Sequence, residues 1–249
     1  MHYKSRRLES RRRSMEQELL HNGWVGLETP YPPNGKVELY AKYQSPRIIE
    51  IGVSDIEQCL KKINRDGESY YALETWSWEL TYLSWQTDRE NPRNHNYIPV
   101  WQAFDCLHDC LLEGIDWKYE DGRSGNIKVI DWEHPEMNTF SYVRGWRGAM
   151  NDGFGWDFVL FVNAIPLAGI VLEPDEKGGR PCAAALSLAQ DQMNSDSTFS
   201  VYAHYIIAGN GKELRMGVPY EELDEFMDTP DTIQAIKPEN FLKKIKDYV

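Results

Sequence analysis

Two patterns in this sequence bring together side chains that do chemistry in other proteins. The first is Cys106-x-His108-x-Cys110, whose thiol and imidazole groups are preferred zinc ligands. On a helix, residues 106 and 110 share a face and residue 108 points away, so we expect buried thiols on an apolar stripe. The second is Ser141 with the scattered histidines, His204 among them. These residues form no visible grouping of nucleophile, base and orienting acid.

A third pattern is a basic N-terminal stretch. Residues 1–13 carry six bases and one acid, whereas the remaining 236 residues carry 21 bases and 38 acids. Such a stretch is typical either of an arm that binds phosphates or of a solvated helical start. Because the rest of the chain is acidic and repels DNA at long range, any nucleic-acid contact must come from a local patch. The candidate DNA-binding residues of this arm are Arg6, Arg7, Arg11, Arg12 and Arg13.

Composition is that of an ordinary globular protein. The chain has 249 residues, 41% of them hydrophobic, which is enough to bury a core without disulfides. Its four cysteines follow no disulfide framework and predict free thiols in a reducing compartment, so we expect a cytoplasmic protein. The longest apolar run, near 158–172, is interrupted by Asn163 and Pro166 and is too short for a membrane helix. We expect no membrane partner and no secretory leader.

These side chains must be positioned by two differently patterned parts of the chain. Helical periodicity predicts a mainly helical region over residues 1–113, with helices at 4–21, 54–64, 68–87 and 99–113. From residue 114 the period is that of strands, which we expect at 126–131, 139–145, 157–162, 165–172 and 200–209.

The last strand is followed by a hairpin signal into 213–217, and further helices are expected at 183–193 and 238–249. Helices first and a sheet with an inserted helix afterwards indicate an α/β or α+β fold. We predict that residues 114–249 form a central mixed sheet flanked by helices and that the N-terminal region packs on it as one compact unit.

The stretch from residue 114 to residue 217 resembles a known family. Its segments read GIDWKYEDG, NIKVIDWEHPEMNTFSYV, WDFVLFVNAIPLAGIVLE and VYAHYIIAGNGKELRMG. They are similar to the N-terminal nuclease domain of the restriction (R) subunit of type I restriction-modification enzymes, which belongs to the PD-(D/E)xK nuclease superfamily. The C-terminal PENFLKKIKDYV resembles the segment before that family's motor domain. The resemblance implies a restriction-endonuclease-like core.

In that family an Asp on one strand and a Glu on the next hold Mg²⁺, and a Lys two residues after the Glu polarises water and phosphate. Asp157 matches the Asp, but Val171 stands at the Glu position and Glu173 at the Lys position. A Gln-x-x-x-Tyr motif follows in the family; Gln190 matches the Gln, and Asn194 replaces the Tyr. Three of the five expected positions have therefore changed their chemical type.

These departures predict a stand-alone, catalytically inactive relative of the R-subunit nuclease domain that acts by binding. The implied partners are subunits of a type I restriction-modification complex, in which the chain would replace or block the R subunit in restriction, antirestriction or regulation. No cofactor is then expected. Gly209-Asn-Gly-Lys212 lacks the pattern of a phosphate-binding loop and the motor domain is missing, so no ATP requirement is expected either.

Two alternatives remain open. A metal-dependent DNA endonuclease could use a rearranged site in which Asp157 and Glu173 hold Mg²⁺, since residues 171 and 173 face the same side of a strand. A DNA-binding module could instead use the basic N-terminal arm and would lose affinity steeply with salt.

Overall fold

The computed structural model describes residues 2–27, 56–64, 99–118, 122–146, 155–173, 183–195, 199, 201–209, 214–219, 227–228 and 232–247. The aromatic segment at 68–87, for which the sequence predicts a helix, lies outside these residues. Among the helices that are described, none is long and apolar enough to cross a membrane.

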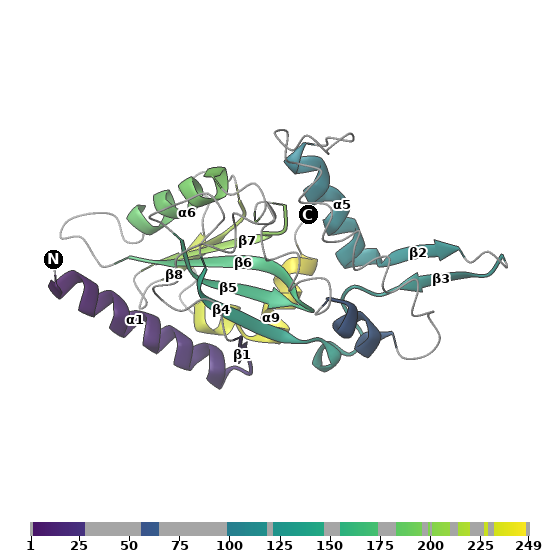
Figure 1. The fold of residues 1–249 in the computed structure, drawn as a ribbon, viewed down its shortest axis with the longest axis horizontal. Helices are drawn as coiled ribbons and strands as arrows, with labels where there is room; N and C mark the ends of the chain where they lie inside the picture. The colour runs from purple at the N-terminus through teal and green to yellow at the C-terminus, as the bar shows by residue number, and fades with distance from the viewer. Residues whose placement is uncertain are drawn as a thin grey trace, which may run out of the picture.

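A seven-stranded mixed sheet is the centre of the described part of the chain (Figure 1). The β1–β4 and β6–β7 pairs are parallel, and the other neighbouring pairs are antiparallel. In their order across the sheet, the strands are β1 (Val25–Gly26), β4 (Phe140–Trp146), β5 (Trp156–Val162), β6 (Ile165–Leu172), β7 (Tyr205–Gly209), β8 (Leu214–Gly217) and β9 (Met227–Asp228).

Helices cover both faces of this sheet (Figure 1). On one face, α6 (Ala183–Ser195) packs its small apolar side chains against β6 and β7. The other face is covered by α1 (His2–His21), α8 (Thr232–Ala235) and α9 (Pro238–Lys246). A mixed central sheet with flanking helices confirms the predicted fold class.

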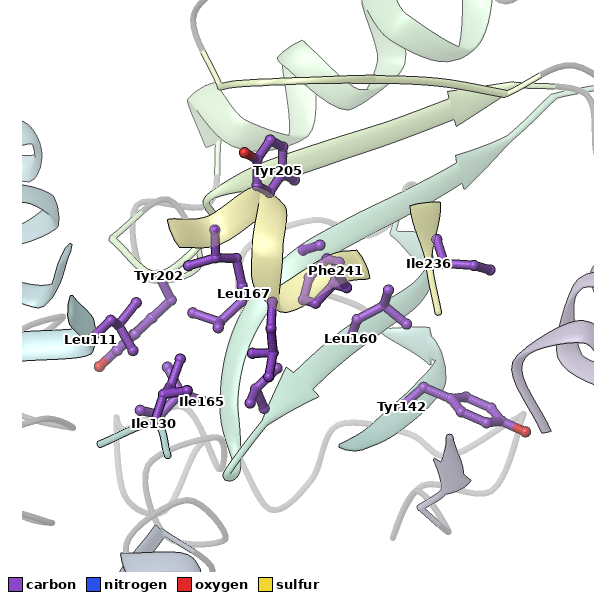
Figure 2. Packing of buried hydrophobic residues seen from close by; sticks show 14 of the residues in the cluster. Leu111, Ile130, Tyr142, Leu160, Ile165, Leu167, Tyr202, Tyr205, Ile236 and Phe241 are labelled. Carbon is purple, nitrogen blue, oxygen red and sulfur yellow. The ribbon is translucent and has the colours of Figure 1, made fainter. Parts of the chain in front are cut away.

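The two central strands, β5 and β6, are buried along their whole length. Their sequences are continuous apolar runs because a strand covered on both faces has no solvent side to which polar residues could point. Leu160 and Leu167 belong to the same buried cluster as Phe241 of α9 (Figure 2). The Tyr205 hydroxyl donates to the Lys244 carbonyl at 2.6 Å. This hydrogen bond holds a second part of α9 on the same face of the sheet.

The turn between β5 and β6 is Asn163-Ala164, and both residues have positive φ angles, 49° and 65°. Two such residues make the tight turn whose twist suits a hairpin. The buried Asn163 amide donates to the Val129 carbonyl at 2.9 Å and to Asn138 Oδ1 at 2.7 Å. Asn138 in turn binds the backbone N–H and carbonyl of Asp131. These two asparagines, which lie in the segments that carry the family resemblance, therefore hold the central hairpin against the chain before β4.

α1 ends at His21, as the sequence predicts, and Gly23 follows it in the closing turn. Gly23 has a φ of 89°, and the N–H groups of Gly23 and Trp24 donate to the Leu20 and Leu19 carbonyls at 3.1 and 3.0 Å. This closing pattern favours glycine because the left-handed conformation costs an L side chain energy. It directs Trp24 into the core, where the indole N–H donates to the Ile236 carbonyl at 2.7 Å. β1 follows at once and pairs with β4, so the N-terminal region contributes a strand to the central sheet.

α5 (Val100–Glu113) leads into a two-stranded antiparallel ribbon of β2 (Ile115–Lys118) and β3 (Ser124–Ile127). This unit extends away from the central sheet (Figure 1). A short helix at 56–63 lies nearby, with Ile56, Leu60 and Ile63 buried as its periodicity predicts.

Two predicted strands are shorter than the sequence suggests. The strand expected at 126–131 ends at Ile127, because the side chain of Asn64 donates to and accepts from the backbone of Lys128, both at 2.9 Å. These bonds use the groups that a partner strand would need. The strand expected at 200–209 begins at Tyr205, since the N–H groups of Tyr202 and Ala203 turn back to the Phe199 carbonyl.

Candidate functional site

Asp157, the match to the family's first metal ligand, lies near the start of β5. Backbone pairing between β5 and β6 begins only at Phe158–Ile170, so Asp157 sits where the two strands separate. Its Oδ2 accepts the backbone N–H of Leu172 at 2.5 Å. The carboxylate therefore supplies the hydrogen bond that a longer strand would give, and it holds the end of β6 in place.

The other oxygen of Asp157 binds Arg12 of α1. The Nε and Nη2 atoms of Arg12 both lie 2.5 Å from Asp157 Oδ1. Asp157 is only 5% exposed, whereas the Arg12 side chain is 36% exposed. Burial raises the pKa of the Asp157 carboxyl above its ordinary value, and the charge of Arg12 and the Leu172 hydrogen bond oppose that rise. Both oxygens of this carboxylate are therefore already bonded to protein donors.

Neighbouring charges fix the position of α1 on the sheet. Arg144 of β4 binds Glu9 at 2.6 Å and Glu16 at 2.8 Å. The hydrogen bond from Arg144 lowers the pKa of Glu9. Burial acts to lower the pKa of Arg144, but the two glutamates outweigh it and raise that pKa. Beneath these charges, Met15 and Leu19 are buried in the core. Packing and charge pairing together place Arg12 at Asp157.

Arg11 of α1 contacts Glu173, the residue that directly follows β6. Arg11 Nη1 donates to the Glu173 carbonyl at 2.9 Å, and the Glu173 N–H donates to the Gly209 carbonyl at 2.9 Å. The Glu173 side chain is half-buried. Of the other arm residues, Arg13 is exposed and lies 3.3 Å from Glu9, and the side chains of Arg6 and Arg7 are outside the described part of the chain. Arg11 and Arg12 thus touch the two strand ends that the family motif occupies.

Val171 is the residue that the sequence resemblance matches to the family's second carboxylate ligand. It is 1% exposed and packs in the apolar cluster with Ala185, Leu186 and Ala189 of α6. Gln190, the match to the family's Gln, lies half-buried on the same helix. This side of β6 is therefore an apolar helix–sheet contact.

These residues do not fit a magnesium ion. Mg²⁺ takes an octahedral set of oxygen ligands and is usually held by one or two carboxylates with waters. At this site the one matching carboxylate has both oxygens bonded to the protein, and the position of the second carboxylate is a buried valine. The described residues that come together as a group of three possible ligands are instead Asp131, Glu133 and His134.

The Asp131 group was not expected from the sequence. Asp131 Oδ1 accepts the backbone N–H groups of Glu133 and His134 at 3.2 and 3.1 Å, which is a local turn interaction. Lys128 Nζ lies 3.6 Å from the same oxygen and 3.4 Å from Glu133. The Lys128 ammonium group lies near both acids, and the turn that the cluster stabilises explains it.

The three side chains of the Cys-x-His-x-Cys pattern do not lie together on α5. The buried stripe of α5 is Ala103, Leu107 and Leu111, and the two cysteines lie beside it: Cys106 is exposed and Cys110 is half-buried. The expectation that both thiols are buried is therefore wrong for Cys106. Burial raises the pKa of the Cys110 thiol to about 11, so it is a poor metal ligand at neutral pH.

His108 reaches a different partner. Its Nδ1 lies 3.1 Å from Nε2 of His204, whose Nδ1 is 2.9 Å from the Tyr202 carbonyl. Because a carbonyl only accepts, His204 Nδ1 carries the proton and His204 Nε2 accepts from His108. Phe104 covers the His204 ring at 4.5 Å between centroids. The two histidines are 96 residues apart, and no local signal in the sequence joins them.

Comparison with known proteins gives one family for this arrangement. The family model of the type I restriction enzyme R protein N terminus matches residues 9–224. A similar protein is the "Putative type I restriction enzyme MjaVIIIP endonuclease subunit" of Methanocaldococcus jannaschii, which is 24% identical over 156 residues. That match covers 57% of this chain and 15% of the relative, so the chain spans a small part of the relative's length. Since the family match extends from α1 to β8 and includes six of the seven strands of the central sheet, the chain belongs to the family of type I restriction enzyme R protein N termini.

Proposed function

We propose that this chain is a catalytically inactive nuclease-fold protein that acts by binding in a type I restriction-modification system. In this role it replaces or blocks the R subunit, and its partners are the other subunits of the complex. Family membership supports the setting. The chemistry of the Asp157 site supports binding without cleavage.

The state of Asp157 is the single observation that carries this proposal. Metal-dependent hydrolysis of a phosphodiester needs a divalent ion that stabilises the developing charge and lowers the pKa of a bound water. A metal ion at Asp157 would have to displace either Arg12 or the Leu172 N–H, and it would find Val171 where its second ligand is expected. The displaced guanidinium would then repel the ion. Each of these costs acts against metal binding.

A cleavage assay tests the loss of catalysis. Purified protein is incubated with plasmid DNA and with Mg²⁺ or Mn²⁺, beside the Asp157→Ala variant and the restoring double variant Val171→Glu/Glu173→Lys. We expect the wild type and Asp157→Ala to be equally inactive. Metal-dependent cleavage by the wild type that disappears in Asp157→Ala would instead establish the nuclease alternative and overturn the proposal.

A binding assay tests the setting. The tagged chain is mixed with the purified methyltransferase and specificity subunits of a type I enzyme from the same cell, and the mixture is passed over a size-exclusion column. We expect the chain to elute with these subunits and to compete with the genuine R subunit. Independent elution at micromolar concentrations of all components would contradict the role as a replacement or blocker. A DNA-only column, at low and high salt, separates protein binding from DNA binding through the arm.

A further inference from the structure

One stripe of α1 carries alternating charges that match charges on the sheet. Glu9, Arg12 and Glu16 follow one another at spacings of three and four residues, which places them on one face of the helix. On the sheet, Arg144 binds both glutamates, and Asp157 binds the arginine between them. The order of charges on the helix is therefore the complement of the order on the strands.

Arg12 differs from the rest of this stripe in what it contacts. Arg144 joins carboxylates that are partly exposed, whereas Asp157 is 5% exposed and stands at the family's metal position. We propose that the Arg12 guanidinium is the resident cation of this site. It takes the place of a divalent metal at Asp157 and ties α1 to the ends of β5 and β6.

Charge balance explains why a guanidinium suits this site. With Val171 in place of an acid, one buried carboxylate remains at the motif. One guanidinium neutralises it, and its planar N–H groups give the directed bonds that both nitrogens of Arg12 make to Oδ1. A divalent ion on the same carboxylate would leave an excess positive charge in a buried position, which is unfavourable. The arginine is also attached to the chain, so its local concentration does not depend on the solution.

This proposal predicts that a small cation can replace the missing side chain. In Arg12→Ala the lost atoms correspond to ethylguanidinium, so that compound is the probe, with ethylammonium at equal concentration as its control. Millimolar Mn²⁺ is the second probe, because a divalent ion would neutralise the carboxylate but leave an excess positive charge in the opened site. The measurement is the melting temperature of the purified chain by circular dichroism.

The variants are Arg12→Ala, the double variant Arg12→Ala/Asp157→Asn and the matched control Arg13→Ala. This control removes an exposed arginine whose ion-pair partner among the described residues, Glu9, also lies on α1. We expect Arg12→Ala to melt about 4–8 °C below the wild type and Arg13→Ala within about 1 °C of it. Ethylguanidinium should restore part of the loss in Arg12→Ala, and Mn²⁺ should restore less of it. Neither should raise the melting temperature of the wild type, of Arg13→Ala or of the double variant.

Three results would overturn the proposal. The first is an Arg12→Ala variant as stable as the wild type, and the second is a loss that ethylguanidinium does not restore. The third is an equal response of the double variant, because the cation would then act elsewhere than at Asp157. If Arg12→Ala is insoluble, the double variant decides the question: it folds if Arg12 serves Asp157, and it fails to fold if Arg12 has another structural role.

This inference does not depend on the partner proposed above. The melting experiment reads the occupancy of the Asp157 site, whereas the cleavage and column assays read catalysis and assembly. A chain that binds no restriction subunit but shows the cation response would refute only the proposed setting. A chain that binds those subunits without the cation response would refute only the role of Arg12.

Discussion

The buried histidine pair should make the stability of this protein fall steeply in mild acid. His204 is fully buried, and this burial is the main reason why its pKa falls to about 4 from an ordinary value of about 6.5. The nearby His108 is a smaller cause of the same shift. Protonation would turn Nε2 of His204 into a donor that faces the N–H of His108. The hydrogen bond would be lost, and two N–H donors would face each other in the interior.

The sign of the effect follows from the direction of the shift. The unfolded chain takes up the proton near pH 6.5 and the folded chain only near pH 4, so acid favours unfolding between these values. The stabilising contribution is complete above about pH 6.5 and is lost as the pH falls toward about 4. A difference of about 2.5 pKa units corresponds to about 3 kcal/mol, since one unit is about 1.4 kcal/mol.

Urea unfolding at several pH values between about 4 and 7.5 measures this contribution. Carboxylates titrate in the same range, so the comparison is between the wild type and His204→Asn, which keeps a donor for the Tyr202 carbonyl and does not titrate. His21→Asn, at the exposed end of α1, is the matched control. We expect the free energy of unfolding of His204→Asn to fall about 3 kcal/mol less than that of the wild type and of His21→Asn. Equal slopes in all three proteins would refute the reasoning.

Three further changes test the packing and charge of the sheet, each by urea unfolding at neutral pH. The free energy of unfolding of Asp157→Asn should stay within about 1 kcal/mol of the wild-type value. Because the pKa of Asp157 is raised in the folded state, the contribution of this group to stability is present in acid and is lost as the pH rises through the folded pKa. A loss above about 3 kcal/mol would contradict this reasoning. Gly169→Ala should cost about 2–3 kcal/mol, because the added Cβ would lie 2.5 Å from Cζ3 of Trp156; unchanged stability would show that Trp156 moves freely. Leu160→Ala should cost about 3 kcal/mol and Leu20→Ala less than about 0.5, since Leu160 is fully buried and Leu20 is 53% exposed; equal costs would contradict the assigned core.

Much of the fold can be predicted from short segments of the sequence. The helix over residues 4–21 follows from periodicity, and its end before Gly23 follows from the one residue type that favours a positive φ there. The runs at 157–162 and 165–172 are apolar at nearly every position, which only strands covered on both faces require. The helix beginning at Pro238 likewise follows from a proline in the first turn. These signals depend on a few adjacent residues, so they can be interpreted without knowledge of the tertiary contacts.

Residue types alone also locate the matches to the family motif and the departures from it. Val171 is apolar and Asp157 opens an apolar strand pattern, and neither property depends on how the chain packs. The basic arm is less informative, because a row of arginines looks the same whether it faces solvent, DNA or the protein itself. The bonds from Arg11 and Arg12 to the ends of β6 and β5 are contacts across 162 and 145 residues. No local propensity encodes a contact over such a distance.

Tertiary structure alone decided which face of α1 meets which strand. Burial of Met15, Leu19 and Trp24 fixes the rotation of the helix, and only then do Glu9, Arg12 and Glu16 come to lie on their partners in the sheet. The same holds for His108 and His204, which meet because α5 packs beside the turn before β7. The sequence by itself determined most of the long elements, the apolar strands and the family. The pairing of charges depended on packing, because hydrophobic burial sets the positions from which short-range polar bonds can form.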